Sequence, residues 1–79
     1  MAYSEDCFVK TDSFSGIVKV ECEYDEQDED WVSVIRSKHE PVPMIDGSVW
    51  HPILVRGEGG SIQAAIDDVL ARYTRGERS

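Results

Sequence analysis

The sequence predicts an α+β domain: an antiparallel β-meander of three to four strands with one C-terminal helix packed on one face. Three observations lead to this prediction. Apolar and polar residues alternate in the first half of the chain, apolar residues recur at helical spacing near its C-terminus, and turn-forming residues lie between these runs. The chain of 79 residues is long enough for a single domain, residues 1–79, with one small core.

The C-terminal helix has the strongest local pattern. Ser61 is placed to cap its N-terminus, because a serine hydroxyl accepts a hydrogen bond from a free amide of the first turn. Gly76 is placed to end it. Between them, apolar residues at helical spacing form one stripe that is expected to pack on the sheet: Ile62, Ala65, Ile66, Val69, Leu70 and Tyr73.

Residues 16–24 form the clearest strand. Its alternate apolar residues are expected to face the core: Val18, Val20, Cys22 and Tyr24. Glu21 and Glu23 then share the solvent face, roughly 6.6–6.8 Å apart. An acidic turn at residues 25–30 leads to a second strand at residues 31–37, and the two strands are expected to pair as an antiparallel hairpin.

The other segments give weaker signals. A short strand is expected around Phe8, which would anchor it, and Phe14 is expected to plug one end of the core. Residues 49–56 are expected to form the third main strand. Pro52 within it has no N–H to donate, which places this strand at an edge or at a bulge. Residues 57–60 are glycine-rich and are expected to form a flexible link to the helix.

The charge of the chain is strongly one-sided. The formal net charge is −8, from 16 acidic and 8 basic residues. Residues 1–30 hold ten acidic and two basic residues, whereas residues 31–79 hold six of each. The whole imbalance therefore lies in the first 30 residues, and seven of the ten residues from 21 to 30 are acidic.

Such an acidic face disfavours direct binding to nucleic acid or to an anionic membrane, because both are polyanions. It favours a basic protein partner. The alternative is a solvated face that keeps a small protein in solution. There is no apolar run of about 18 residues that would span a membrane. There is also no signal peptide at the N-terminus, so a cytoplasmic location with reduced thiols is expected.

The sequence offers no catalytic motif and no cofactor site, and the protein is not expected to be an enzyme. Cys7, Cys22, His39 and His51 are scattered, without the close pairs that structural zinc sites use. The acidic turn lacks the ligand spacing and the glycine of an EF-hand loop. Residues 57–61 lack the lysine of a phosphate-binding loop. A Cys7–Cys22 disulfide requires the two cysteines to lie on neighbouring strands.

The predicted functional site is the acidic run with the tryptophan that follows it. Its carboxylates recur at intervals of the same order as the phosphates of a nucleic-acid strand, so they are suited to occupy Lys and Arg side chains that otherwise hold DNA or RNA. Trp31 adds an aromatic anchor ringed by carboxylates. The predicted partner-binding residues are Glu21, Glu23, Asp25, Glu26, Asp28, Glu29, Asp30 and Trp31.

With this acidic turn at residues 25–30, its short length and its β-then-helix layout, the chain resembles the small phage-encoded anti-CRISPR proteins. The resemblance covers size, charge and layout, with no shared motif, so the site residues come from the charge alone. It implies an inhibitor that covers a basic DNA-binding surface of a type I CRISPR–Cas complex, on the Cas7 backbone or the large subunit. Target DNA binding would be blocked inside the bacterial host cell.

Two other classes of function stay open. One is a small dimeric regulatory or antitoxin-like protein that associates through an edge strand or an exposed part of the helix. The other is a structural or accessory phage protein. The sequence leaves the choice between a monomer and a homodimer undecided.

Overall fold

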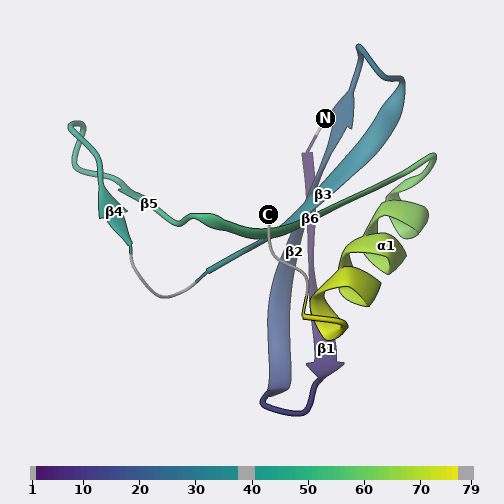
Figure 1. The fold of residues 1–79 in the computed structure, drawn as a ribbon. Helices are drawn as coiled ribbons and strands as arrows, with labels where there is room; N and C mark the ends of the chain where they lie inside the picture. Colours follow the sequence, from purple (N-terminus) through teal and green to yellow (C-terminus); the bar gives the residue numbers. More distant parts are fainter. Residues whose placement is uncertain (1, 38–40, 77–79) are drawn as a thin grey trace.

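The computed structural model describes residues 2–37 and 41–76. Four strands form one antiparallel sheet in the order β1-β2-β3-β6, and the C-terminal helix α1 packs on one face of it (Figure 1). The predicted α+β class is confirmed. Strands β4 and β5 form a separate small hairpin. The elements are β1 (Ala2–Lys10), β2 (Ser15–Asp25), β3 (Asp30–Arg36), β4 (Val42–Pro43), β5 (Val49–Trp50), β6 (Ile53–Gly59) and α1 (Ile62–Thr74).

The core lies between the sheet and the helix. Alternation along each strand sends every second side chain toward α1, so that Val18, Val20 and Cys22 are buried as predicted. Tyr24, the next residue in this series, lies beyond the core with 38% of its surface exposed. The buried apolar side chains contacting one another are Cys7, Val9, Val18, Val20, Cys22, Ile35, Val55, Ile66 and Val69.

The helix begins and ends as the sequence predicts. The Ser61 hydroxyl accepts a hydrogen bond from the Ala64 N–H at 3.1 Å, which satisfies one amide of the first turn. Gly76 has a φ of 80°, in the left-handed region that favours glycine, and its N–H donates to the Tyr73 carbonyl. The predicted stripe is the packed face, with Ala65, Ile66 and Val69 fully buried.

Gly57 and Gly59 are not part of a flexible link, as expected from the sequence, but belong to strand β6. The helix passes directly over them. A Cβ atom on Gly57 would lie 2.5 Å from the Val69 backbone nitrogen, and one on Gly59 would lie 2.7 Å from the Ala64 Cβ. These two glycines therefore set how closely the helix backbone approaches the strand backbone.

Three further expectations need correction. The N-terminal strand is not short, because β1 pairs with β2 along its full length from Ala2 to Lys10. Phe8 is not an anchor, since Cys7 and Val9 take the inward positions and 68% of Phe8 is exposed. Phe14 does not plug the core, because 40% of its surface is exposed in the β1–β2 turn.

The strand expected at residues 49–56 is interrupted at Pro52. Its first part belongs to β5 and its second part to β6, which is an edge strand of the sheet. A register shift lies close by, where Ile35 pairs with Val55 but Arg36 pairs with Ile53. The expectation that Pro52 marks an edge or a bulge is thus confirmed, because both occur beside it.

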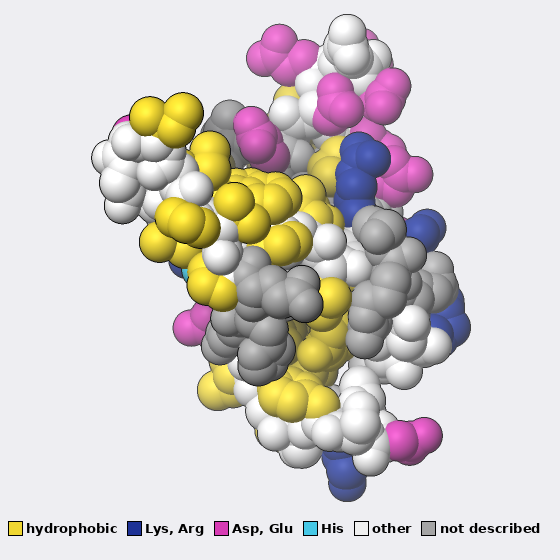
Figure 2. Space-filling model, turned by 60° about the vertical axis from the view of Figure 1, so that its left-hand side comes forward, with side chains coloured by type: hydrophobic (Ala, Val, Ile, Leu, Met, Phe, Trp, Pro, Cys, Tyr) yellow, Lys and Arg dark blue, Asp and Glu magenta, His cyan; other side chains and the backbone are white. Residues whose placement is uncertain are grey.

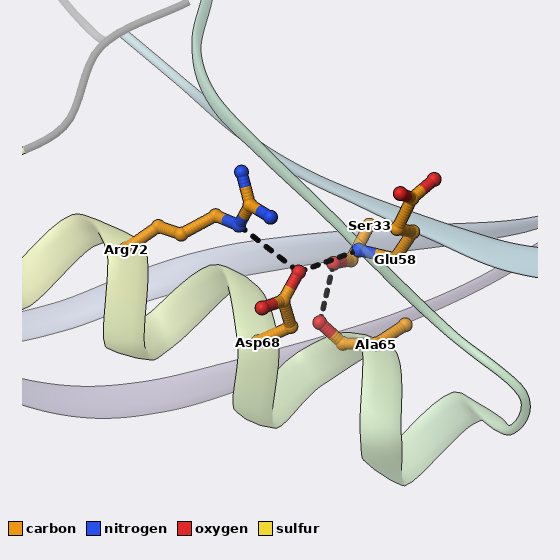
Figure 3. A network of polar contacts seen from close by, with 5 residues as sticks. All are labelled: Ser33, Glu58, Ala65, Asp68 and Arg72. Carbon is orange, nitrogen blue, oxygen red and sulfur yellow. Dashed lines mark hydrogen bonds and ion pairs between the residues drawn. The ribbon is translucent and has the colours of Figure 1, made fainter.

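Polar contacts fix the helix to strands β3 and β6 (Figure 3). The buried Ser33 hydroxyl donates to the Ala65 carbonyl at 2.6 Å. One Asp68 carboxylate oxygen accepts from the Glu58 backbone N–H at 2.9 Å and from the Arg72 Nε at 3.0 Å. Asp68 thereby satisfies a backbone donor at the outer edge of the sheet while its own charge is paired with Arg72.

The β4–β5 hairpin stands away from the sheet (Figure 1). Its turn contains Gly47 with a φ of 90°, and the Asp46 carboxylate accepts hydrogen bonds from the Ser48 N–H and hydroxyl. These bonds lower the pKa of Asp46. All side chains from residue 41 to residue 50 are exposed, and the Arg36 guanidinium lies 5.9 Å from the Trp50 ring centre.

Both cysteines lie in the core as free thiols. They are on neighbouring strands, but Cys7 pairs with Val18 whereas Cys22 pairs with Tyr3, so the register keeps them apart and the predicted possibility of a disulfide is not realised. Burial, with the hydrogen bond to Glu5 and its negative charge, raises the pKa of Cys7 to about 11. Burial also raises the pKa of Cys22.

We expect Gly57→Ala to destabilise the protein by about 1–3 kcal/mol, because the added methyl group forces the helix away from the strand. The matched control is Gly60→Ala, since an added Cβ there meets nothing within 4 Å. The control should stay within about 0.5 kcal/mol of the wild type. Urea unfolding measures both variants, and equal stability of the two would show that the close approach of α1 to β6 does not constrain the fold.

We expect Cys7 to react slowly in the folded protein. At pH 8, a thiol with a pKa of about 11 holds far less thiolate than an ordinary one. Alkylation by iodoacetamide, followed by mass spectrometry of the Cys7 peptide, should run roughly tenfold to hundredfold slower than in the urea-unfolded protein. The rate should rise as the pH approaches 11. Equal rates in the folded and unfolded protein would contradict the burial of this thiol.

Candidate functional site

The acidic run lies at the end of the β2–β3 hairpin. Tyr24 pairs with Trp31 and Asp25 pairs with Asp30, so the turn proper is residues 26–29. One Asp25 carboxylate oxygen accepts from the backbone N–H groups of Gln27, at 3.0 Å, and Asp28, at 3.4 Å. Asp25 therefore shapes the turn, by the side-chain-to-backbone bonding typical of aspartate in turns.

The turn residues are the most accessible part of the run. Glu26, Asp28 and Glu29 are exposed, whereas Asp25 and Asp30 are half-buried. Glu29 has a φ of 53°, which closes the turn without a glycine. Figure 2 shows acidic side chains gathered around this upper end of the molecule. In the described residues, the ion pairs involve Glu21 and Asp68 and none of the carboxylates from Asp25 to Asp30.

We call the end of this hairpin the acidic tip, comprising the exposed Glu23, Glu26, Asp28 and Glu29 and the half-buried Asp30. Figure 1 shows the β2–β3 hairpin extending beyond the end of α1, so the acidic tip projects from the body of the molecule.

Glu21 is not part of the acidic tip, because its charge is paired with Arg36. Its carboxylate lies 3.1 Å from the Nε of Arg36, which reaches across from strand β3. The same guanidinium donates to the His51 carbonyl at 2.8 Å and lies against the Trp50 ring. Glu21 thus belongs to a contact that joins the sheet to the base of the β4–β5 hairpin.

The predicted site residues divide between the two faces of the sheet. Glu21 and Glu23 project from the face opposite α1, because they alternate with the buried residues of β2. Trp31 lies on the helix side, half-buried against the core. Its ring meets that of Tyr24 edge to face, with centres 5.5 Å apart and planes at 66°. Trp31 therefore supports the hairpin from one face while Glu21 and Glu23 lie on the other.

A groove of about 680 Å³ runs along the open face of the sheet, starting at the acidic tip, whose Glu23 and Glu26 form part of its lining. Its lining includes Glu21 and Glu23 together with three basic residues that the predicted site did not contain: Lys19, Arg36 and Arg56. Lys19, like Glu21, alternates with the buried residues of β2, so the strand period places it on this face. Arg36 and Arg56 come from other strands, and their place follows from the sheet register. The groove is therefore mixed in charge, and uniform negative charge is confined to the acidic tip.

Among the described residues, no three His, Cys, Asp or Glu side chains converge to hold a metal ion. The Nδ1 atom of His51 is buried and has no hydrogen-bond partner within that part of the chain. His39, another scattered candidate ligand, lies outside the described residues. The described helix is too short and too polar to cross a membrane.

Comparison with known proteins gives no relative for this chain. No protein-family model, curated protein sequence or solved structure matches it. The functional argument therefore rests on the geometry and charge of the chain itself.

Proposed function

We propose that this chain is a non-enzymatic inhibitor whose acidic tip binds the basic nucleic-acid-binding surface of a protein partner. The partner we propose is a type I CRISPR–Cas surveillance complex in the bacterial cytoplasm, where the bound inhibitor blocks the binding of target DNA. The observation that carries the proposal is the cluster of carboxylates at one projecting end of a chain whose second half is neutral. Most of these carboxylates are exposed, and within the described residues none of them forms an ion pair.

The electrostatics of the acidic tip suit this role. Glu26, Asp28 and Glu29 are exposed on one short turn, so their fields add in the same direction. A basic groove that normally holds phosphates presents the complementary field. The main gain is a faster and more selective encounter, and it weakens with salt because the charges are accessible to screening ions.

The hairpin is ordered before any partner binds. The Asp25 carboxylate fixes the turn, and the Tyr24–Trp31 pair supports the strands that lead to it. A preformed turn loses little conformational entropy on binding, which favours affinity for the same contacts. Among the predicted residues, Asp25 and Trp31 then act by positioning the tip, and Glu23, Glu26, Asp28, Glu29 and Asp30 are the ones proposed to meet the partner.

The test is inhibition of DNA binding by a purified type I surveillance complex, measured by the mobility shift of a labelled target duplex. The tip variant is Glu26→Gln, Asp28→Asn and Glu29→Gln, which leaves the turn-forming Asp25 intact. We expect the wild type to prevent the shift and the tip variant to need a concentration about tenfold higher or more, since three charge-pair contacts are lost.

The matched control is Asp12→Asn, Asp46→Asn and Asp67→Asn. These residues are exposed and lie away from the acidic tip, and the control variant has the same net charge of −5 as the tip variant, changed from −8. We expect the control to inhibit within about threefold of the wild type. An equal loss of inhibition in the tip variant and the control variant would show that net charge, and not the acidic tip, causes the effect. A wild-type protein that leaves the DNA shift unchanged would refute the proposed partner.

A further inference from the structure

The two edges of the sheet differ in how they are protected. The β6 edge is covered in part, because Asp68 from the helix accepts the outward N–H of Glu58 and Pro52 precedes the strand without an N–H of its own. Strand β1, at the other edge, pairs with β2 on one side, and no described strand pairs with its other side. It is nine residues long and contains neither proline nor a bulge.

The backbone of β1 is set for pairing at this open edge. The Thr11 N–H donates to the Phe14 carbonyl at the β1–β2 turn, which identifies that pair as hydrogen-bonded. Hydrogen-bonded and non-bonded pairs alternate along an antiparallel ladder. The odd-numbered residues of β1 therefore direct their N–H and C=O groups to β2. The even-numbered residues direct theirs to the open edge: Ala2, Ser4, Asp6, Phe8 and Lys10.

The same even-numbered residues carry exposed side chains on the open face of the sheet. Phe8 is 68% exposed, and Ile17, its partner on β2, is 59% exposed. These two apolar side chains lie side by side at the end of the sheet opposite the acidic tip. Asp6 and Lys10 flank Phe8 on the same strand and face, two residues to either side.

We propose that a second copy of this chain pairs with β1 in antiparallel fashion, about a two-fold axis at Phe8. This register sets Phe8 against Phe8 of the second copy, and Asp6 against Lys10 of the second copy on both sides of the axis. The outward backbone groups of the paired residues meet one another. The result is a continuous eight-stranded sheet, crossed on its open face by an apolar row of two Phe8 and two Ile17 side chains.

Neighbouring registers fit less well. An axis at Asp6 sets two like charges opposite each other, which destabilises the pair. An axis at Cys7 sets Asp6 against Phe8 and leaves the charges of Asp6 and Lys10 without an opposite charge. In registers that pair an even-numbered residue with an odd-numbered one, only one residue of each pair directs its N–H and C=O groups to the open edge. The backbone hydrogen bonds between the two copies are then lost. The register centred on Phe8 pairs the opposite charges, brings the apolar side chains together and allows the backbone hydrogen bonds.

Long-range repulsion does not oppose this arrangement. The acidic tip begins at Glu23, six residues beyond Ile17 along β2, which is roughly 20 Å of strand. An antiparallel partner directs its tip the opposite way, so that the two tips lie roughly 40 Å apart. The Debye length at physiological salt is about 8 Å, so the charges of one tip are screened from the other. Both tips remain accessible to other partners.

The experiment is a charge-swap series measured by sedimentation equilibrium from about 1 to 500 μM, the range in which a modest interface of this kind would show. We expect the wild type to dimerise reversibly. Asp6→Lys sets two lysines opposite each other and Lys10→Asp sets two aspartates opposite each other, so each should weaken the dimer about tenfold. The double variant Asp6→Lys/Lys10→Asp restores opposite charges and should return to within about threefold of the wild type.

The series separates pairing from net charge. Asp6→Lys lowers the net negative charge and Lys10→Asp raises it, whereas the double variant has the wild-type value of −8. If repulsion between whole molecules controlled association, the dimer of Asp6→Lys would be tighter than the wild-type dimer and that of Lys10→Asp would be weaker. The proposed register instead weakens the dimer in both variants. Lys19, which pairs with position 6 inside one chain, meets the same new lysine in the single and the double variant, so its effect cancels in that comparison.

Phe8→Ser completes the test. Because Phe8 is exposed, this variant should keep the wild-type circular dichroism spectrum, and it should lose most of the dimer. A wild type that stays monomeric throughout the concentration range would overturn the proposal. So would a dimer that Phe8→Ser leaves unchanged, or a double variant no tighter than its single parents.

Discussion

The close approach of the helix backbone to strand β6 is the constraint on which the rest of the structure depends. Gly57 and Gly59 lie under α1, and Val69 and Ala64 occupy the space that side chains would fill. The core can then be built from small residues: the largest fully buried side chains are Ile66, Val20, Val55, Val69 and Ser33. Because the layer between sheet and helix is thin, the aromatic residues are displaced to its margins. Trp31 and Tyr73 cover the core from the sides, and Phe8 and Phe14 lie outside it.

One helix covers one face of the sheet, and this division explains where the polar chemistry lies. The open face carries charges of both signs, and the Glu21–Arg36 pair neutralises part of them. The uniform charge is left at the acidic tip, where the β2–β3 hairpin extends beyond the helix (Figure 1). The exposed apolar side chains Phe8 and Ile17 lie at the opposite end of the same face. Charge and apolar surface are therefore separated along the length of the strands, which gives the two ends of the molecule different binding properties.

The sequence predicts the elements whose side chains follow a period. The stripe from Ile62 to Tyr73 and the alternation from Val18 to Cys22 are both found as expected. Glycines have no side chain to show a period, so Gly57 and Gly59 resemble a linker in the sequence although they lie in a strand. In β1, hydrophobicity and size predict that Phe8 faces the core. The smaller Cys7 and Val9 face it instead, because they fit the thin core.

The candidate site was predictable in part. The cluster of carboxylates at a turn follows from composition, and its division between two faces follows from the strand period. The Glu21–Arg36 ion pair joins positions fifteen residues apart, and it depends on the register between β2 and β3. The role of Asp25 depends on the turn conformation, since its carboxylate holds backbone amides. The ion pair arises from how separate segments meet, so local sequence does not carry it. The Asp25 contact is local, but which carboxylate of the acidic run makes it depends on the conformation of the turn.

The β4–β5 hairpin has a consequence for how the chain assembles. Strands β1, β2 and β3 follow one another directly, but β6 reaches β3 after the long excursion that contains β4 and β5. The Ser37 N–H donates to the Pro52 carbonyl at 2.8 Å and closes the base of this excursion. A self-paired hairpin inside a connection shortens the flexible length that must be closed, and closure entropy grows with that length. The hairpin thus lowers the entropic barrier to docking β6, and with it the helix, onto the first three strands.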